Sequence, residues 1–298
     1  MDELDKLLQI SVEEEKNRIM NFIKSSVTKL SRSGVVFGLS GGLDSSVVAY
    51  FVKELFSDNS LALILPEKDS NKENMEDAEE LAKKLDLNYE IMDITPILEQ
   101  FGTYDIVPSS LKSPVLIKAM IKTVRTLKHR TILHSLAPDE ISRQRKEVRA
   151  AFAFGMPKLR TRMILLHKYA LLNDYAVLGT TNKTEYLLGH YDIYGDGAVD
   201  IECLLHLYKS QERELAKFMR VPEKIISKPP SPDLLPGLTD EDIMGMSFIN
   251  IDRILAFIES EKPDNEAQKY GISGKKINEA KKATRNSSYR RELPLSLI

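Results

Sequence analysis

The sequence feature that most constrains the fold is a six-residue stretch, SGGLDS, which begins at Ser40. It lies between an apolar run at residues 34–39 and a stretch of helical character at residues 46–56. Adjacent glycines let the backbone turn without Cβ clashes and present successive N–H groups to an anion. The first turn of a following helix adds unpaired donors and a positive dipole end. The order strand, glycine turn, helix therefore predicts a phosphate-binding loop.

Asp44, inside this stretch, indicates a metal. A carboxylate does not favour a bare anion. It is favourable beside a polyphosphate if Mg²⁺ lies between them, because Mg²⁺ usually takes one or two carboxylates plus phosphate oxygens. We therefore expect a magnesium nucleotide as the ligand. The alternative is an ordinary glycine turn in which Asp44 caps a helix. A Walker A loop is excluded, because the chain has no glycine-spaced GK[ST] ending.

The composition is that of a globular protein with no basic excess. The 298 residues are enough to bury a sizeable core. A single cysteine, Cys203, allows no internal disulfide, which fits a reducing compartment. The acidic, polar start and the lack of long apolar runs predict a cytoplasmic protein without a membrane partner. A formal net charge of −2 provides no global attraction for nucleic acid, so no such partner is expected.

Short apolar runs alternate with amphipathic stretches, which is an α/β pattern. Helical spacing from Asn71 predicts a helix capped by that residue. The fold class predicted is a doubly wound, mostly parallel sheet flanked by helices, which binds ligands beyond the carboxyl ends of its strands. The loop at residues 38–45, Pro66 and Thr180 follow such ends and should converge on one crevice. The predicted strands are Val35–Leu39, Leu61–Leu65, Tyr89–Ile94 and Ala176–Gly179.

A segment from Tyr104 to Pro157 has no strand signal. Residues 115–130 and 138–152 have helical character and are rich in Lys and Arg. We interpret this segment as an inserted basic helical hairpin within a single domain that spans residues 1–298. Its basic positions either meet phosphates or form a solvated helix surface, and the sequence leaves both open.

A second concentration of polar residues follows the last predicted strand, between Gly179 and Gln211. Its ionisable groups are too numerous near a strand end for a simple loop, and Glu185 is suited to supply a second carboxylate for the metal. Within it, the stretch GDGAVD at residues 195–200 looks superficially like a dinucleotide fingerprint. It lacks the final glycine and does not open a helix after a strand, so we reject that interpretation.

The stretch SGGLDS resembles the PP-loop of the ATP pyrophosphatases, which cleave ATP between the α and β phosphates and transfer AMP to an acceptor. With six further blocks, in the family's order, most of the chain is similar to ammonia-dependent NAD synthetase. The blocks are LILPEKDSN at Leu63, RTRM at Arg160, GTTNKTE at Gly179, YGDGAVDI at Tyr194, YKSQERELA at Tyr208 and KPPSPDLLPGLTDED at Lys228. The resemblance implies a Rossmann-like, adenine nucleotide alpha hydrolase-like fold, a ligase that forms a C–N bond, and a homodimer.

The resemblance also implies roles for individual residues. Asp44 and Glu185 would bind Mg²⁺, and Arg160 and Asp200 would contact deamido-NAD. The chain departs from the family at Ile193, where a lysine is common, at Tyr289 and Arg290, where His-Lys is common, and near Met156, where an Asn is common. We assign the first three of these positions to the same substrate. The expected ATP contacts are Gly38, Leu39, Ser40, Gly41, Gly42, Leu43, Asp44, Ser45, Thr180, Lys209 and Ser231.

The reaction implied by the resemblance is the amidation of deamido-NAD to NAD, with ATP and ammonia as co-substrates. Adenylation activates the nicotinate carboxylate, and ammonia then displaces AMP. Asp44 and Lys209 would act on the phosphates, and Asp196 is our candidate to accept a proton from ammonia, although a turn aspartate looks the same. Cys203 lies inside the substrate block and not in a separate amidase domain, so we expect free ammonia, or ammonia passed from a separate protein, and not glutamine as the nitrogen source. Alternative hypotheses are a PP-loop RNA-modifying enzyme and a non-catalytic nucleotide-binding module.

Overall fold

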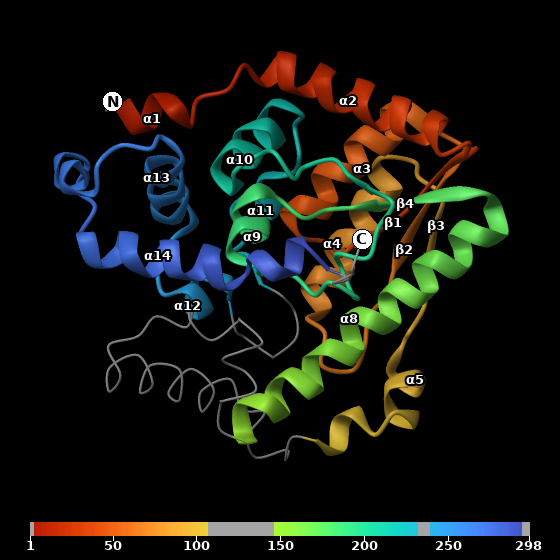
Figure 1. Ribbon diagram of the computed structural model, residues 1–298. Helices are drawn as coiled ribbons and strands as arrows, with labels where there is room; N and C mark the ends of the chain where they lie inside the picture. The colour runs from red at the N-terminus through yellow and green to blue at the C-terminus, as the bar shows by residue number, and fades with distance from the viewer. Residues whose placement is uncertain (1–2, 107–145, 232–238, 294–298) are drawn as a thin grey trace.

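A single parallel sheet of five strands forms the centre of the molecule (Figure 1). The computed structural model describes residues 3–106, 146–231 and 239–293. The spatial order is β3-β2-β1-β4-β5. The chain adds β2 and β3 on one side of β1 and then crosses over to add β4 and β5 on the other, so the order of strand addition reverses between β1 and β4. In open α/β sheets a ligand crevice forms at such a point, beyond the carboxyl ends of the strands. The strands are β1 (Gly34–Gly38), β2 (Ser60–Ile64), β3 (Tyr89–Ile91), β4 (Tyr175–Gly179) and β5 (Ile201–Glu202).

Helices cover both faces of the sheet, as predicted for a doubly wound fold. Alternate residues of β1 point to opposite faces: Val35 and Phe37 join one buried cluster, and Val36 joins the other. The first face is covered by α2 (Val12–Lys29), α3 (Leu43–Phe56), α4 (Lys72–Lys84) and α10 (Lys209–Phe218). The second is covered by α5 (Thr95–Gln100) and α8 (Lys146–Asn173). Because both faces are buried, the strands carry consecutive apolar residues.

A smaller helical group packs beside the sheet, at the left of Figure 1. Two further apolar clusters hold it together, and Phe248, Ile254 and Phe257 lie in them. It consists of α1 (Glu3–Leu7), α13 (Phe248–Glu259), η4 (Asp264–Tyr270) and α14 (Gly274–Asn286). The short elements that complete the described chain are η1 (Thr103–Asp105), α9 (Lys183–Leu188), α11 (Glu223–Ile226), α12 (Asp240–Met244) and η5 (Ser288–Arg291).

Several predicted boundaries differ from the structure. The strand predicted to reach Ile94 ends at Ile91, because Ile94 turns inward and precedes α5. The two-residue strand β5 was not predicted. Most of the predicted helical hairpin, residues 107–145, lies outside the described residues. Its last part does not end at Pro157, since α8 runs from Lys146 through Pro157 to Asn173. Asn71 caps α4 as predicted, through a bond from the Glu73 amide.

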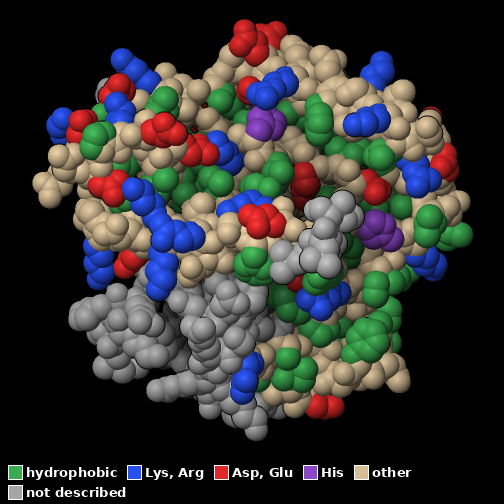
Figure 2. All heavy atoms as spheres, in the orientation of Figure 1, with side chains coloured by type: hydrophobic (Ala, Val, Ile, Leu, Met, Phe, Trp, Pro, Cys, Tyr) green, Lys and Arg blue, Asp and Glu red, His purple; other side chains and the backbone are tan. Residues whose placement is uncertain are grey.

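No described helix combines the length and the apolar character needed to cross a membrane. Figure 2 shows acidic and basic side chains interspersed over the described part of the visible face. Charges of both signs at short spacing offset each other's field at a distance.

Candidate active site

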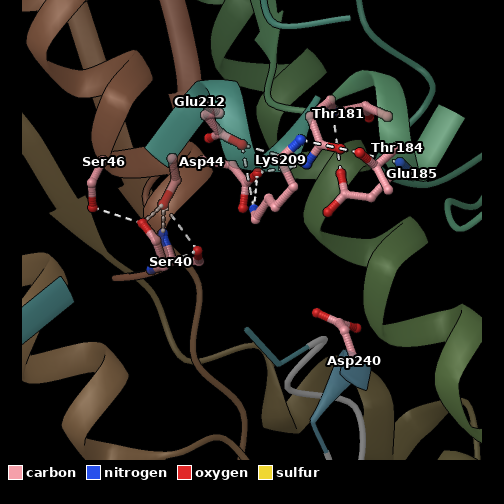
Figure 3. Close-up of polar contacts among 12 residues, drawn as sticks. Ser40, Asp44, Ser46, Thr181, Thr184, Glu185, Lys209, Glu212 and Asp240 are labelled. Carbon is pink, nitrogen blue, oxygen red and sulfur yellow. Dashed lines mark hydrogen bonds and ion pairs between the residues drawn. The ribbon is translucent and has the colours of Figure 1, made fainter. Parts of the chain in front are cut away.

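The PP-loop connects β1 to α3 at the reversal point of the sheet, as the sequence predicts. Gly41 has a φ of +76°, and a Cβ there would lie 2.0 Å from the backbone oxygen of Asn74 on α4. Both the left-handed backbone and the close contact require glycine. The hydroxyl of Ser40 accepts from the Gly42 amide at 3.2 Å, and the Ser40 amide donates to the Ser45 hydroxyl at 3.1 Å (Figure 3). The loop is therefore held in a turn by its own serines and by α4.

A buried ion cluster lies directly behind this loop (Figure 3). Lys209, the first residue of α10, is 1% exposed, and its ammonium binds Asp44 Oδ1 and lies 3.4 Å from Glu212 Oε2. Asn182 also donates to Asp44 Oδ1, at 2.9 Å. Asp44 Oδ1 thus accepts a hydrogen bond from both Lys209 and Asn182. Asp44 does not cap α3 with its side chain, because Gly42 is the N-cap residue.

The pKa values of this cluster follow from burial and from the excess of carboxylates. Burial acts to raise the pKa of Asp44, but Lys209 holds it below its usual value. Burial acts to lower the pKa of Lys209, but Asp44 and Glu212 raise it, so the ammonium stays charged. Burial, and then the negative charge of Asp44, raises the pKa of Glu212 well above its usual range. Among the described residues, Glu212 Oε1 has no hydrogen-bond partner.

Glu185 approaches the cluster from the start of α9. Asn182 caps this helix: its side chain accepts from the Glu185 amide at 3.1 Å, and Glu185 Oε2 accepts from the Asn182 amide at 3.2 Å. Burial, and then the charge of Asp44, raises the pKa of Glu185 to about 8. Figure 3 shows Asp240 below Glu185, and His190 binds the Asp240 carboxylate at 2.8 Å.

This donor set fits a divalent cation that is completed by phosphate. After burial, the negative charge of Asp44 is what raises the pKa of Glu185, and a cation shared by the two carboxylates would offset that repulsion. Their oxygens are the ligands that Mg²⁺ prefers, and Mg²⁺ commonly uses only one or two protein carboxylates beside phosphate and water. The described residues contain no cluster of three or more His, Cys, Asp or Glu that would hold a metal alone.

A second group of polar residues lies on the loop after α9. Arg160 on α8 donates twice to Asp192, with Nε–Oδ2 at 2.7 Å and Nη2–Oδ1 at 3.1 Å, and stacks near the Tyr194 ring. Its side chain is 46% exposed. Asp196 Oδ1 accepts from the Asp192 amide at 2.7 Å. Burial raises the pKa of the Asp196 carboxyl to about 6. Two of the predicted site residues, Arg160 and Asp196, are thus joined through Asp192.

The other residues predicted to contact the acceptor substrate bond mainly to backbone atoms. Asp200 accepts from the Val177 amide at 2.8 Å and so ties β4 to the start of β5. Arg290 on η5 donates to the backbone oxygens of Gly189 and Tyr191, and its Nε donates to Tyr289 Oη at 3.0 Å. These bonds fix the loop that continues to Ile193, which is half-buried.

Thr180 and Ser231 are the predicted ATP contacts that lie outside the PP-loop and α10. Thr180 is half-buried at the carboxyl end of β4, one residue beyond Gly179. Ser231 is exposed and is the last described residue before residues 232–238.

Three residues that contact the predicted site residues in the structure were assigned no role from the sequence. Asn182 holds Asp44, Glu212 lies beside Lys209, and Asp192 joins Arg160 to Asp196. A signal existed for two of them. Asn182 and Glu185 have the spacing of a capping box after a strand, and Lys209 and Glu212 are three apart on one helix. The role of Asp192 depends on a contact across 32 residues of chain.

A family model and curated relatives indicate the same family for this chain. The NAD synthase family model matches residues 15–110 and 105–294. NH(3)-dependent NAD(+) synthetase of Thermotoga maritima is 41% identical over 288 residues, which cover 94% of this chain and 98% of that protein. The Methanocaldococcus jannaschii protein of the same name is 35% identical over 286 residues, which cover 95% of this chain and 96% of its own.

Two solved structures resemble the whole chain. One is NMN synthetase from Francisella tularensis, with a TM-score of 0.73, 29% identity, and coverage of 97% of this chain and 99% of that one. The other is NH3-dependent NAD synthetase from Campylobacter jejuni, with a TM-score of 0.68, 28% identity, and coverage of 97% and 100%. The PP-loop at the sheet reversal, the Asp44–Lys209 pair and these similarities agree: this chain belongs to the NAD synthase family.

Proposed function

We propose that the chain is an ammonia-dependent NAD synthetase, which uses ATP and ammonia to convert deamido-NAD to NAD with release of AMP and pyrophosphate. The observation that carries this proposal is the Asp44–Lys209 ion pair behind the PP-loop, in a chain that matches the family over almost its whole length. A buried cation beside an anion-binding loop is the arrangement that a departing pyrophosphate needs.

The phosphate side of the reaction depends on residues 38–45, Lys209 and the two carboxylates. The loop amides and the first turn of α3 bind the β and γ phosphates. Asp44 and Glu185 would hold Mg²⁺, which when bound would supply positive charge beside the polyphosphate. Lys209 stays charged in the buried cluster, and its ammonium stabilises the pyrophosphate as the α-phosphorus transfers to the nicotinate carboxylate. Thr180 and Ser231 contribute to the nucleotide site.

The acceptor side of the reaction depends on the loop after α9. Arg160 and Asp192 fix this loop against α8. Asp196, whose pKa is raised to about 6, is ionised at neutral pH and still basic enough to take a proton from the attacking ammonia. Arg160, Asp200, Ile193, Tyr289 and Arg290 are the positions that we assign to acceptor recognition.

A second candidate acceptor is nicotinate mononucleotide. The observation that favours it is the similarity to NMN synthetase from Francisella tularensis over 97% of the chain. The chemistry at the carboxylate is the same for both acceptors, so the PP-loop does not discriminate between them. Selection between the two depends on contacts beyond the nicotinate nucleotide.

The test is product formation by mass spectrometry. The parent chain receives ATP, Mg²⁺, ammonium and either the dinucleotide or the mononucleotide acceptor, and Asp44→Ala and Arg160→Ala are measured beside it. We expect NAD from the dinucleotide and loss of product in both variants. A higher kcat/KM for the mononucleotide would select the second candidate. Retention of activity in Arg160→Ala alone would reject the acceptor assignment and leave the ATP site standing.

Three expectations complete the proposal. Glutamine in place of ammonium should give no product from the purified chain. The active species should be a homodimer, which sedimentation would show. The protein should act in the cytoplasm, where its nucleotide substrates are found.

A further inference from the structure

The carboxylate of Asp77 on α4 binds two lysines from different segments. Lys224 on α11 reaches Oδ1 at 2.6 Å, and Lys228, which follows α11, binds Oδ2. The Asp77 side chain is 5% exposed, against 17% for Lys228 and 45% for Lys224. Both oxygens of one buried carboxylate therefore hold the chain at residues 224–228 against α4. The proposed reaction uses neither Asp77 nor its two lysines.

Lys228 makes one more contact, and this contact leads to the PP-loop. Its ammonium lies 3.0 Å from Asn74 Oδ1. The backbone oxygen of Asn74 is the atom that leaves no room for a side chain at Gly41, where a Cβ would lie 2.0 Å away. Asn74 therefore contacts the PP-loop through its backbone oxygen and Lys228 through its side chain.

The chain that leaves Lys228 reaches Ser231 through two prolines. Proline restricts φ, so the position of Lys228 largely sets the course of Pro229 and Pro230. At the far end of this short path, the Asp240 amide donates to the Pro230 oxygen at 2.9 Å. The segment is tethered on both sides, by Lys228 to α4 and by Pro230 to α12.

We propose that Lys228 is a positioning residue for ATP: through Asp77 and Asn74 it holds the segment that carries Ser231 in register with the PP-loop. This inference rests on the proposed function, since it takes the PP-loop and Ser231 as parts of one nucleotide site. Lys224 provides a matched comparison. It binds the same carboxylate, but it lies on α11 and has no contact with Asn74 among those that the described residues show.

The experiment compares Lys228→Met with Lys224→Met. Binding of Mg·ATP is measured directly by calorimetry, and the KM values for ATP and acceptor are measured separately. We expect Lys228→Met to weaken ATP binding about tenfold, the scale of one charge-assisted hydrogen bond, with the acceptor KM unchanged. Lys224→Met should bind ATP like the parent, and Lys228→Arg should recover part of the loss. If the two methionine variants changed ATP binding equally, or not at all, the proposal would be overturned. The two lysines would then be structural contacts that only join α11 to α4.

A further variant covers the case in which Lys228→Met does not fold. Asn74→Ala leaves both lysines on Asp77 and removes only the link to the PP-loop side. It should weaken ATP binding about threefold, as loss of one hydrogen bond in a partly exposed site does. Parent-like binding there would reject the inference. A parent chain that binds no ATP would instead reject the proposed function.

Discussion

Lys209 is the buried positive charge on which the phosphate chemistry depends. Replacing it with Met leaves Asp44 and Glu212 without their cation in a buried site. We expect kcat to fall by about 10²–10³-fold, the usual scale for removing one preorganised donor. The free energy of unfolding should fall by about 3–5 kcal/mol at neutral pH, because a buried charge loses its partner. Steady-state kinetics and urea unfolding give both values.

The control for this change is Lys183→Met. Lys183 binds Glu259 at 2.6 Å, but both side chains are partly exposed, at 25% and 42%. Its loss should change the free energy of unfolding by less than about 1 kcal/mol. If Lys183→Met and Lys209→Met reduced kcat equally, the central role of Lys209 would be wrong.

Asp196 gives the reaction its expected pH dependence. Its folded pKa of about 6 lies above the ordinary value of 3.8, so the folded protein binds the proton more tightly than the unfolded chain. Stability from this group is present below about pH 4 and is lost as the pH rises to about 6. The carboxylate that forms is the base. At constant free ammonia, amide formation should therefore rise with an apparent pKa near 6 and then level off.

Asp196→Asn is the matching variant, since its side-chain oxygen still accepts from the Asp192 amide as in the parent. It should lose the rise near pH 6 and most of the rate, within the 10²–10⁴-fold usual for a general base. An unchanged pH profile would show that Asp196 is only a turn residue.

Individual site residues were predictable from sequence where a motif fixes them locally. Ser40, Gly41 and Asp44 share one turn, and their neighbours in the chain are enough to place them. The pairing of Asp192 with Arg160 was not predictable, because Arg160 lies on a helix that is distant in the sequence. The Arg160 guanidinium is paired with the Asp192 carboxylate, and a sequence pattern of basic residues does not reveal such a pair.

At the scale of the element, the PP-loop depends on the fit between its turn and α4. Gly41→Ala forces a Cβ to within 2.0 Å of the Asn74 oxygen and strains a φ of +76°. Gly271→Ala has a similar φ of +70°, but nothing lies within 4 Å of its Cβ. Gly271→Ala should cost about 1–2 kcal/mol of stability and leave ATP binding intact. Gly41→Ala should cost more and should abolish ATP binding, as measured by calorimetry. Equal ATP binding by the two variants would contradict this account of the loop.

The core strands were largely predictable, because β1, β2 and β4 are buried on both faces and consist of consecutive apolar residues. The edges of the sheet were predictable only in part. The edge strand that begins at Tyr89 was predicted, but it is three residues long and ends at Ile91, short of the predicted Ile94. The other edge strand, β5, pairs through two residues, carries no strong hydrophobic signal and was missed. The run of α8 through Pro157 was also missed, because proline usually ends a helix.

At the scale of the whole molecule, binding of Mg·ATP should stabilise the fold. A ligand that binds only the folded chain at a hundred times its Kd adds about 2.7 kcal/mol, which corresponds to roughly 4 °C in Tm for a protein of this size. The shift should largely disappear when EDTA removes the metal, because the Asp44 carboxylate then repels the polyphosphate with no cation between them. Differential scanning calorimetry measures it. An equal shift with EDTA would exclude a metal bridge.

The most direct test of the central claim follows an oxygen atom. The nicotinate carboxylate of deamido-NAD is labelled with ¹⁸O, and the products formed with ATP, Mg²⁺ and ammonium are analysed by mass spectrometry. If the PP-loop and Lys209 hold pyrophosphate while the carboxylate attacks the α-phosphorus, one labelled oxygen must appear in AMP, with one pyrophosphate released per NAD. Label in inorganic phosphate, with ADP as the nucleotide product, would contradict the account.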